Sequence, residues 1–146
     1  MSKERIFPDY VQLETLNDMS KGTMVEHVGI EFTAIGDDFI EATMPVDHRT
    51  KQPMGLLHGG ASVVLAETLG SVAASSVLDL TKQYAVGLEI NANHIKSAKN
   101  GLVKGKATPV HIGRGTHVWS IEIKNEEGNL VAISRITMAI LNHNKK

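Results

Sequence analysis

The residue with the clearest chemical potential is Glu67, which lies in the segment 55–78, GLLHGGASVVLAETLGSVAASSVL. From Ala61 onward this segment is apolar or small apart from hydroxyl groups, and Glu67 carries its only charge. A carboxylate can act as a nucleophile or a general base, but burying one is costly unless another group pairs with it. We therefore expect Glu67 to belong to a functional site. The alternative is a structural ion pair with an arginine or a lysine across an interface.

A second candidate site is the start of the helix that this segment predicts, at His58, Gly59 and Gly60. The free N–H groups of a first helical turn bind anions, and two glycines let another group approach them closely. The other interpretation of the glycines is a tight turn, and His58 either orients a bound group or caps the helix. Glu67 lies about 12 Å further along the helix axis, so it cannot share one small site with Gly59 of its own chain.

Length and composition are those of a single globular domain, which we place at residues 1–146. The net charge of −1 gives no basic surface for nucleic acid, and no segment approaches the roughly 20 apolar residues of a membrane span. The first residues lack the apolar core of a secretory signal, so we expect a cytoplasmic protein. Cysteine is absent and the seven histidines show no pair at ligand spacing, which argues against thiol chemistry and a metal site.

The chain before the long helix predicts a short helix, capped by Asp9 and ended by Gly22. Two strands, at 27–35 and 38–44, and a loop at 45–57 follow it.

Four strands are expected after the long helix, at 84–94, 102–110, 117–124 and 130–141. In the strand expected at 84–94, side chains should alternate strictly between the two faces. One face would then carry Tyr84, Val86, Leu88, Ile90, Ala92 and His94. Short turns between the strands favour an antiparallel sheet. The fold class is therefore α+β, with a four-strand meander curved around one central helix.

The motif Gln52-Pro53-x-Gly55-x-x-His58-Gly59-Gly60, followed by Glu67, resembles the hotdog-fold acyl-CoA thioesterases. The similarity runs from the first hairpin to residue 141 and includes the stretches EATMPVD, TKQPMGLLHGGASVVLAE and VGLEINANHIKSA. It points to the branch acting on aromatic acyl groups, such as 1,4-dihydroxy-2-naphthoyl-CoA in menaquinone biosynthesis, and to the proofreading thioesterases of enterobactin synthesis. The resemblance implies a hotdog fold, an antiparallel sheet wrapped around one long helix.

The resemblance also implies catalytic roles. The Gly59 N–H group would polarise the thioester carbonyl, with Gln52 or His58 holding that region in place. In a homodimer with antiparallel central helices, Glu67 of one subunit would face Gly59 of the other, as a nucleophile or as a general base. Ser71, one turn beyond Glu67, would orient the carboxylate or water, and its alternative role is simple packing. The family suggests a dimer of dimers, and no cofactor is expected because CoA is part of the substrate.

Cations and open backbone N–H groups are needed for the phosphates of CoA. The best candidates lie at the helix start, in the turn 94–99 and in the bend 111–115: Gly60, His94, Lys96, Ser97, His111, Gly113 and Arg114. The alternative for each turn is an ordinary solvated surface.

Two other functions are compatible with this motif. One is hydratase or dehydratase chemistry on an acyl-carrier substrate. This chemistry requires a histidine and an acidic residue in the same site. The other is a non-catalytic acyl-CoA binding module, which has no need of a lone helix carboxylate. Within thioester hydrolysis, phenylacetyl-CoA and acyl-carrier proofreading substrates remain open.

Overall fold

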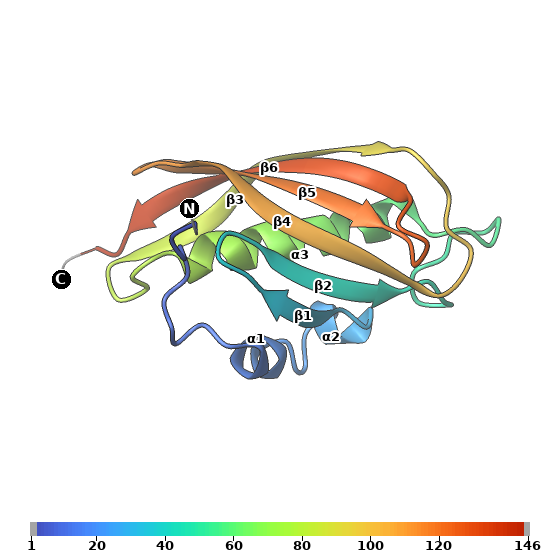
Figure 1. Cartoon of the computed structure of the whole chain (residues 1–146), viewed down its shortest axis with the longest axis horizontal. Coiled ribbons are helices and arrows are strands. Elements are labelled where there is room, and N and C mark those ends of the chain that lie inside the picture. Colours follow the sequence, from blue (N-terminus) through green and yellow to red (C-terminus); the bar gives the residue numbers. More distant parts are fainter. Residues whose placement is uncertain (1–2, 145–146) are drawn as a thin grey trace.

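The computed structural model describes residues 3–144, and its centre is a long helix covered by a curved antiparallel sheet (Figure 1). The helices are α1 (Leu13–Met19), α2 (Met24–His27) and α3 (Gly59–Ser76). The strands are β1 (Glu31–Ile35), β2 (Ile40–Pro45), β3 (Gln83–His94), β4 (Leu102–Ile112), β5 (Thr116–Lys124) and β6 (Leu130–Asn142). The α+β class and the antiparallel sheet around one helix are therefore confirmed.

The strand order is β1-β2-β4-β5-β6-β3, with every neighbouring pair antiparallel. The expected four-strand meander is wrong, because β3 pairs with β6 and β4 pairs with β2. The link 95–101 crosses the end of the molecule instead of forming a hairpin. Backbone hydrogen bonds from Leu57 N to Ala98 O (2.8 Å) and from Val46 N to Gly101 O (2.9 Å) tie it to the preceding segments, and Ile95 N and Lys96 N donate to Val131 O (2.8 and 3.2 Å).

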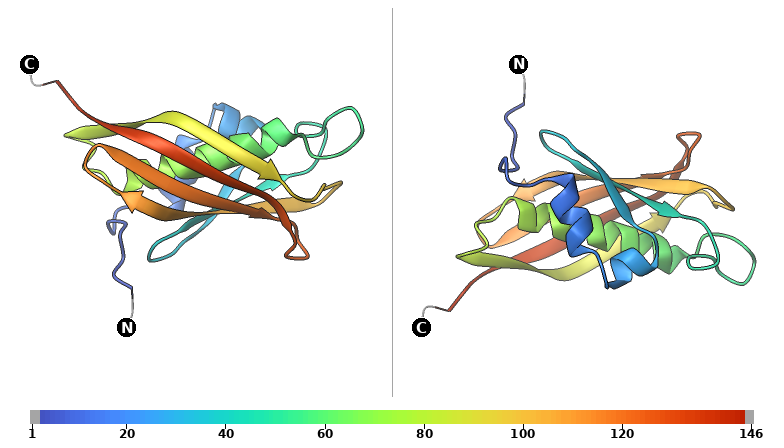
Figure 2. Two further views of the ribbon diagram at one scale, coloured as in Figure 1. Left: turned by 90° about the horizontal axis from the view of Figure 1, so that it is seen from above. Right: turned by 90° about the horizontal axis from the view of Figure 1, so that it is seen from below.

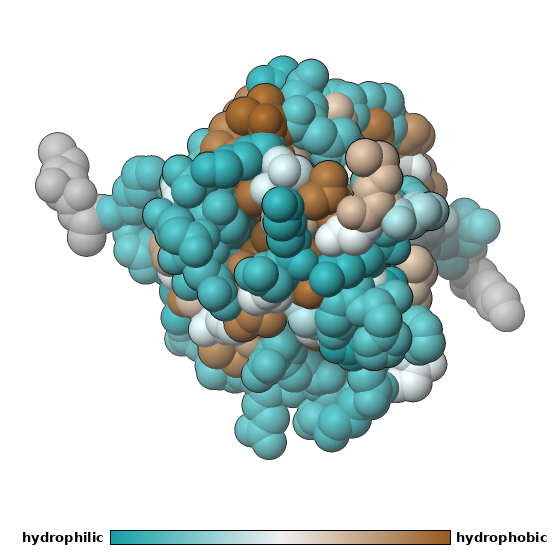
Figure 3. Space-filling model, turned by 90° about the vertical axis from the view of Figure 1, so that its right-hand side faces the viewer, coloured by the Kyte–Doolittle hydropathy of each residue, from teal (hydrophilic) through white to brown (hydrophobic). Residues whose placement is uncertain are grey.

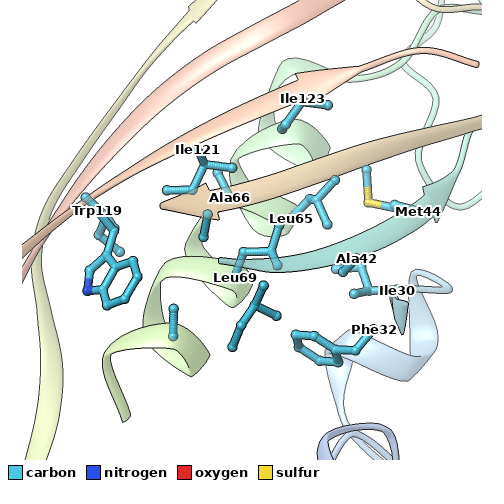
Figure 4. Packing of buried hydrophobic residues seen from close by; sticks show 14 of the residues in the cluster. Ile30, Phe32, Ala42, Met44, Leu65, Ala66, Leu69, Trp119, Ile121 and Ile123 are labelled. Atoms are coloured by element: carbon cyan, nitrogen blue, oxygen red, sulfur yellow. The ribbon is translucent and has the colours of Figure 1, made fainter. Parts of the chain in front are cut away.

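The face of α3 against the sheet follows the helical period. Its buried residues are Ser62, Leu65, Ala66, Leu69, Gly70, Ala73, Ala74 and Ser76. Figure 4 shows the leucines of this face surrounded by side chains of several strands. This continuous core fixes both the rotation of α3 and the direction of the residues on its other side.

A β-bulge at Leu88 changes the faces of β3, because Gly87 pairs with Met138 while Glu89 pairs with the next residue, Thr137. Tyr84 and Val86 therefore do not share a face with Ile90, Ala92 and His94, and the single face expected for this strand is wrong. The extra residue shifts the alternation by one position, which sequence periodicity alone does not register.

The N-terminal region also departs from expectation. The strand expected at 27–35 begins only at Glu31, and His27 belongs to α2. Asp9 does not cap α1, whose N-cap is Gln12, without a side-chain cap, and whose C-cap is Ser20 rather than Gly22. Thr23 caps α2 by accepting a hydrogen bond from Val25 N.

The two short helices lie on the side of α3 that faces away from the sheet, and α1 crosses α3 there (Figure 2). The Asn17 side chain attaches α1 to β1, because it accepts from Phe32 N (2.9 Å) and donates to Phe32 O (3.0 Å). In the described part of the chain, none of the helices combines the length and apolar character needed to cross a bilayer.

Candidate active site

The first turn of α3 opens into a hollow of about 290 Å³ at the end of the molecule that carries the loops 46–58 and 95–101. Five of the residues singled out from the sequence line it: Gln52, Gly59, His94, Lys96 and Ser97. Figure 3 views the molecule from this end and shows a mainly hydrophilic surface with hydrophobic side chains near its middle. Segments distant in the chain thus meet where the helix begins. We call this hollow the Gly59 pocket.

His58 caps the helix, because its Nδ1 atom accepts a hydrogen bond from Gly60 N at 2.8 Å. The carbonyl of His58 accepts from Ala61 N (2.9 Å) and from Ser62 N (3.2 Å). Among the described residues, Gly59 N alone of these first-turn amides has no hydrogen-bond partner. The amide that can bind a developing oxyanion is therefore that of Gly59, while the amide of Gly60 is occupied.

The His94 imidazole lies directly against Gly59. A Cβ atom at residue 59 would be 2.9 Å from His94 Nε2, closer than real Cβ contacts. A larger residue at this position would therefore have to displace the exposed His94 ring, whereas glycine lets the ring approach the helix start closely. The sequence assigned His94 to CoA binding, and the structure places it beside the open amide of the helix.

Gln52 lies at the base of a closed loop. Its backbone N donates to Leu56 O (2.8 Å) and its side-chain oxygen accepts from Met54 N. The loop is tied to the start of α3 by a bond from His58 N to Thr50 O (2.8 Å). Gln52 lines the Gly59 pocket, and with its oxygen occupied, its NH₂ group is the part of the side chain that can donate to a ligand there.

An ion pair between Arg49 and Asp47 holds the start of the same loop. Arg49 donates to both carboxylate oxygens of Asp47, at 2.7 to 3.2 Å. Hydrogen bonds from the side chain and the backbone of Arg49 lower the pKa of Asp47 to about 2. Thr50, which is buried, donates to Pro45 O at 2.7 Å and completes this anchor.

Glu67 lies in a different hollow, of about 320 Å³, which it shares with Met24, Val25, Val64 and other residues of α2 and α3. None of the residues of the Gly59 pocket lines this second hollow. Glu67 is half-buried, and the ion pairs of the described residues all lie elsewhere. The separation expected from the helix rise is therefore found in the structure, and no cation of the described residues pairs with Glu67.

Gly87 supports the Glu67 carboxylate and was missed in the sequence. A Cβ atom at residue 87 would lie 2.8 Å from Glu67 Oε1, so any larger residue there would displace the carboxylate from its place against β3. A glycine inside a strand pattern signals a bulge or a close approach, and here it marks both.

Ser71 does not contact Glu67 by a hydrogen bond within the protomer. Its hydroxyl is directed to the Met138 sulfur at 3.9 Å. The geometry within the chain is that of a packing residue.

The bend 113–115 lies at the other end of the molecule. It is closed by a bond from Gly113 N to Thr116 O (2.9 Å), and β5 starts there beside the end of β6. His94 instead pairs with Ala132 near the start of β6. Within one protomer, His111, Gly113 and Arg114 therefore do not join Lys96 and Ser97.

Two further observations concern the rest of the surface. A hollow of about 600 Å³ on the outer face of the sheet is lined by Lys104, Glu122 and neighbouring residues, and contains none of the predicted site residues. Among residues 3–144, no three histidine or acidic side chains are grouped as a metal site requires.

Similarity to known proteins agrees with this geometry. The family described as the thioesterase superfamily matches residues 54–132. The 1,4-dihydroxy-2-naphthoyl-CoA hydrolase of Escherichia coli (strain K12) is 57% identical over 131 residues, covering 90% of this chain and 96% of that protein. The proofreading thioesterase EntH of Cronobacter turicensis is 49% identical over 136 residues, covering 93% and 98%.

Solved structures agree as well. A thioesterase from Haemophilus influenzae has a TM-score of 0.91 and 49% identity, covering 94% of this chain and 95% of that one. A glutamine-to-alanine variant of a thioesterase from Pseudomonas aeruginosa has a TM-score of 0.93 and 45% identity, covering 94% and 99%. With the strand order, the central helix and the family match all in agreement, this chain belongs to the thioesterase superfamily and is a hotdog-fold thioesterase.

Proposed function

We propose that the protein hydrolyses aromatic acyl-CoA thioesters of the 1,4-dihydroxy-2-naphthoyl-CoA type in sites shared between two subunits. The observation that carries this proposal is the division of the catalytic groups within one chain. Among residues 3–144, the Gly59 amide is without a hydrogen-bond partner in one hollow, and Glu67 is without an ion-pair partner in another. Two incomplete halves on one helix are completed by a second copy in the opposite direction.

The free edge of β3 supports this assembly. This strand is 12 residues long and forms one edge of the sheet, where β6 is its one partner in the described part of the chain. Its Leu88 side chain is 63% exposed, and Tyr84 and Val86 are also exposed. A long, apolar edge strand is a template for pairing with another chain. Antiparallel pairing of two such edges would set the two α3 helices side by side, with Glu67 toward the partner subunit's Gly59.

The reaction then follows from the groups present. The thioester carbonyl oxygen accepts from Gly59 N–H, and the Gln52 NH₂ group is a second donor. Glu67 of the other subunit attacks the carbonyl carbon to give a mixed anhydride, or takes a proton from an attacking water. Collapse of the tetrahedral intermediate breaks the C–S bond and releases CoA as a thiolate. In the nucleophilic route, water then hydrolyses the mixed anhydride, which releases the free acid and regenerates the Glu67 carboxylate. No cofactor takes part in these steps.

The nucleotide portion is assigned to the Gly59 side. The Lys96 ammonium group and Ser97 border the Gly59 pocket, where a charged donor can bind phosphate. In an antiparallel dimer, the far end of one subunit comes toward the Gly59 end of the other. The bend with His111 and Arg114 therefore stays a candidate for the nucleotide. From the family resemblance we further propose a dimer of dimers, a cytoplasmic location and a role in menaquinone biosynthesis.

Subunit complementation tests this proposal. Glu67→Gln should abolish thiol release from benzoyl-CoA and naphthoyl-CoA, and Gly59→Ala should lower it by about 10²- to 10³-fold, without a change in oligomeric state. Co-refolding equal amounts of the two inactive variants should restore about a quarter of the wild-type activity, because random pairing of two-fold dimers leaves one site in four intact. Near wild-type kcat in Glu67→Gln refutes the catalytic role, and absence of recovery refutes the shared site. Hydration of an enoyl thioester without thiol release would instead indicate hydratase chemistry.

A further inference from the structure

α3 packs directly on the inward face of β6. A Cβ atom at Gly70 would overlap the Ile136 side chain, so the helix backbone lies close to the strand at this level. The next inward residue of β6 is Met138, which is 1% exposed and pairs with Gly87 of β3. Met138 is therefore fixed beneath α3, beside the strand position against which the Glu67 carboxylate lies.

The Met138 sulfur is close to two side chains of α3. The Ser71 hydroxyl donates to it at 3.9 Å. A Cβ atom at residue 87 would lie 4.0 Å from the same sulfur and 2.8 Å from Glu67 Oε1, so the sulfur and the carboxylate border one point above β3. One buried thioether thus contacts the hydroxyl and flanks the carboxylate.

Ser71 lies one turn beyond Glu67 on the same side of α3. Its hydroxyl has a single hydrogen to donate, and a carboxylate one turn away is a stronger acceptor than a thioether. The structure nevertheless directs this hydrogen to Met138, and among residues 3–144 no side-chain hydrogen bond reaches Glu67. The carboxylate therefore keeps its oxygens free for a substrate or a water.

We propose that Met138 is a positioning residue that acts through Ser71 and holds the Ser71 hydroxyl away from the Glu67 carboxylate. The inference rests on the proposed function, in which Glu67 is the nucleophile or the general base. A hydrogen bond to a carboxylate stabilises its charged form and so makes it a weaker nucleophile and a weaker base. By accepting the Ser71 hydrogen, the sulfur prevents this loss of reactivity.

Methionine is the residue type that suits this position. A thioether accepts a hydrogen bond but has no hydrogen to donate and no charge. An amide or a hydroxyl at residue 138 would bring a second donor next to Glu67, and a carboxylate would bring a buried charge. Leucine would fill the space without accepting from Ser71. The sulfur is therefore an acceptor for the hydroxyl that leaves the carboxylate undisturbed.

Met138→Leu tests this role, because it removes the acceptor and keeps a buried side chain of similar volume. The freed hydroxyl should then donate to Glu67 and lower kcat for benzoyl-CoA by about tenfold, with KM changed by less than about twofold. The matched control is Met44→Leu, the same exchange at an equally buried residue of β2. It should leave kcat unchanged.

The Ser71→Ala background separates positioning from packing. Without the hydroxyl, Met138→Leu should change kcat by less than about twofold, so the two substitutions should be strongly non-additive. Urea unfolding of the wild type, the two single variants and the double variant keeps stability apart from activity. If Met138→Leu does not fold, replacement of all methionines by norleucine exchanges sulfur for a methylene group. It should lower kcat in the wild type but not in Ser71→Ala.

The outcomes separate the inference from the function on which it rests. A wild type that releases no thiol from benzoyl-CoA or naphthoyl-CoA, or a Glu67→Gln variant with near wild-type kcat, refutes the proposed function and the role of Met138 with it. In an active enzyme that depends on Glu67, an unchanged kcat in Met138→Leu refutes the role of Met138 alone. An equal loss with and without the Ser71 hydroxyl also refutes it. A loss confined to proteins that retain Ser71 supports it.

Discussion

The close approach of His94 to Gly59 gives the sharpest prediction. In Gly59→Ala, the new Cβ atom would lie 2.9 Å from His94 Nε2 and 3.1 Å from His94 Cε1. The His94 ring must then move, or the methyl group must occupy the space in which the thioester carbonyl approaches the open amide. If the methyl group occupies that space, the carbonyl oxygen can no longer reach the amide of residue 59; if the ring moves instead, the wall of the Gly59 pocket beside this amide changes.

The expected loss follows from the contact that is removed. Loss of one oxyanion donor lowers kcat by about 10²- to 10³-fold, or about 2.7 to 4 kcal/mol of transition-state stabilisation. Stability should not fall, because alanine is favoured over glycine within a helix by up to about 1 kcal/mol. Activity and stability should therefore change independently.

The assay is steady-state thiol release from an aryl-CoA ester, combined with urea unfolding of the same samples. Gly115→Ala is the matched control, because a Cβ atom there meets nothing within 4 Å. His94→Ala, alone and with Gly59→Ala, separates ring displacement from blocked carbonyl binding. A kcat for Gly59→Ala within about threefold of the control, in a folded protein, would refute the oxyanion role of this amide.

Two other predictions test the carboxylate and the core. Gly87→Ala would put a methyl group 2.8 Å from Glu67 Oε1, and displacement of the carboxylate should lower kcat about a hundredfold. The measurement is thiol release, with Gly115→Ala as the control. An unchanged kcat would contradict the positioning role of Gly87. The pKa of His117 lies below its ordinary value of 6.5, mainly because the side chain is buried and secondly because the charge of the nearby His111 repels a proton on it. The unfolded chain therefore binds a proton at this residue at a higher pH than the folded protein does. Above about pH 7, the free energy of unfolding should therefore not depend on this group. As the pH is lowered from 7, the free energy of unfolding should decrease by at most about 1.4 kcal/mol per pH unit. In urea unfolding, His117→Gln should make this decrease smaller between pH 7 and pH 5. Equal slopes in the two proteins would contradict the assignment.

Local sequence was sufficient for the parts of the site that depend on one element. Gly59, Gly60 and Glu67 were identified because a helix start and a lone charge in an apolar segment are both visible in the chain. Their separation followed from the helical rise alone. The resemblance to the family rested on the motif 52–60 with Glu67 and on three contiguous stretches, and the family match covers residues 54–132.

Other features were decided by contacts between distant segments. The pairing of β3 with β6 depends on where the link 95–101 is anchored, at Val46 and Leu57. The reversal of faces within β3 depends on a bulge at Leu88, which no alternation pattern predicts. The role of His58 as a cap was left open by the sequence, and the bond from Gly60 N decided it.

The sequence by itself determined the central helix, its open first turn, its single carboxylate and the family of the protein. These properties reside in short stretches, because helix periodicity, glycine freedom and charge are carried by the residues themselves. Only the tertiary structure decided that His94 lies against Gly59, that Gly87 supports Glu67 and that α1 stands apart from α3. Each of these depends on the register and crossing of elements far apart in the chain, and close packing fixes that register only when the whole core is assembled.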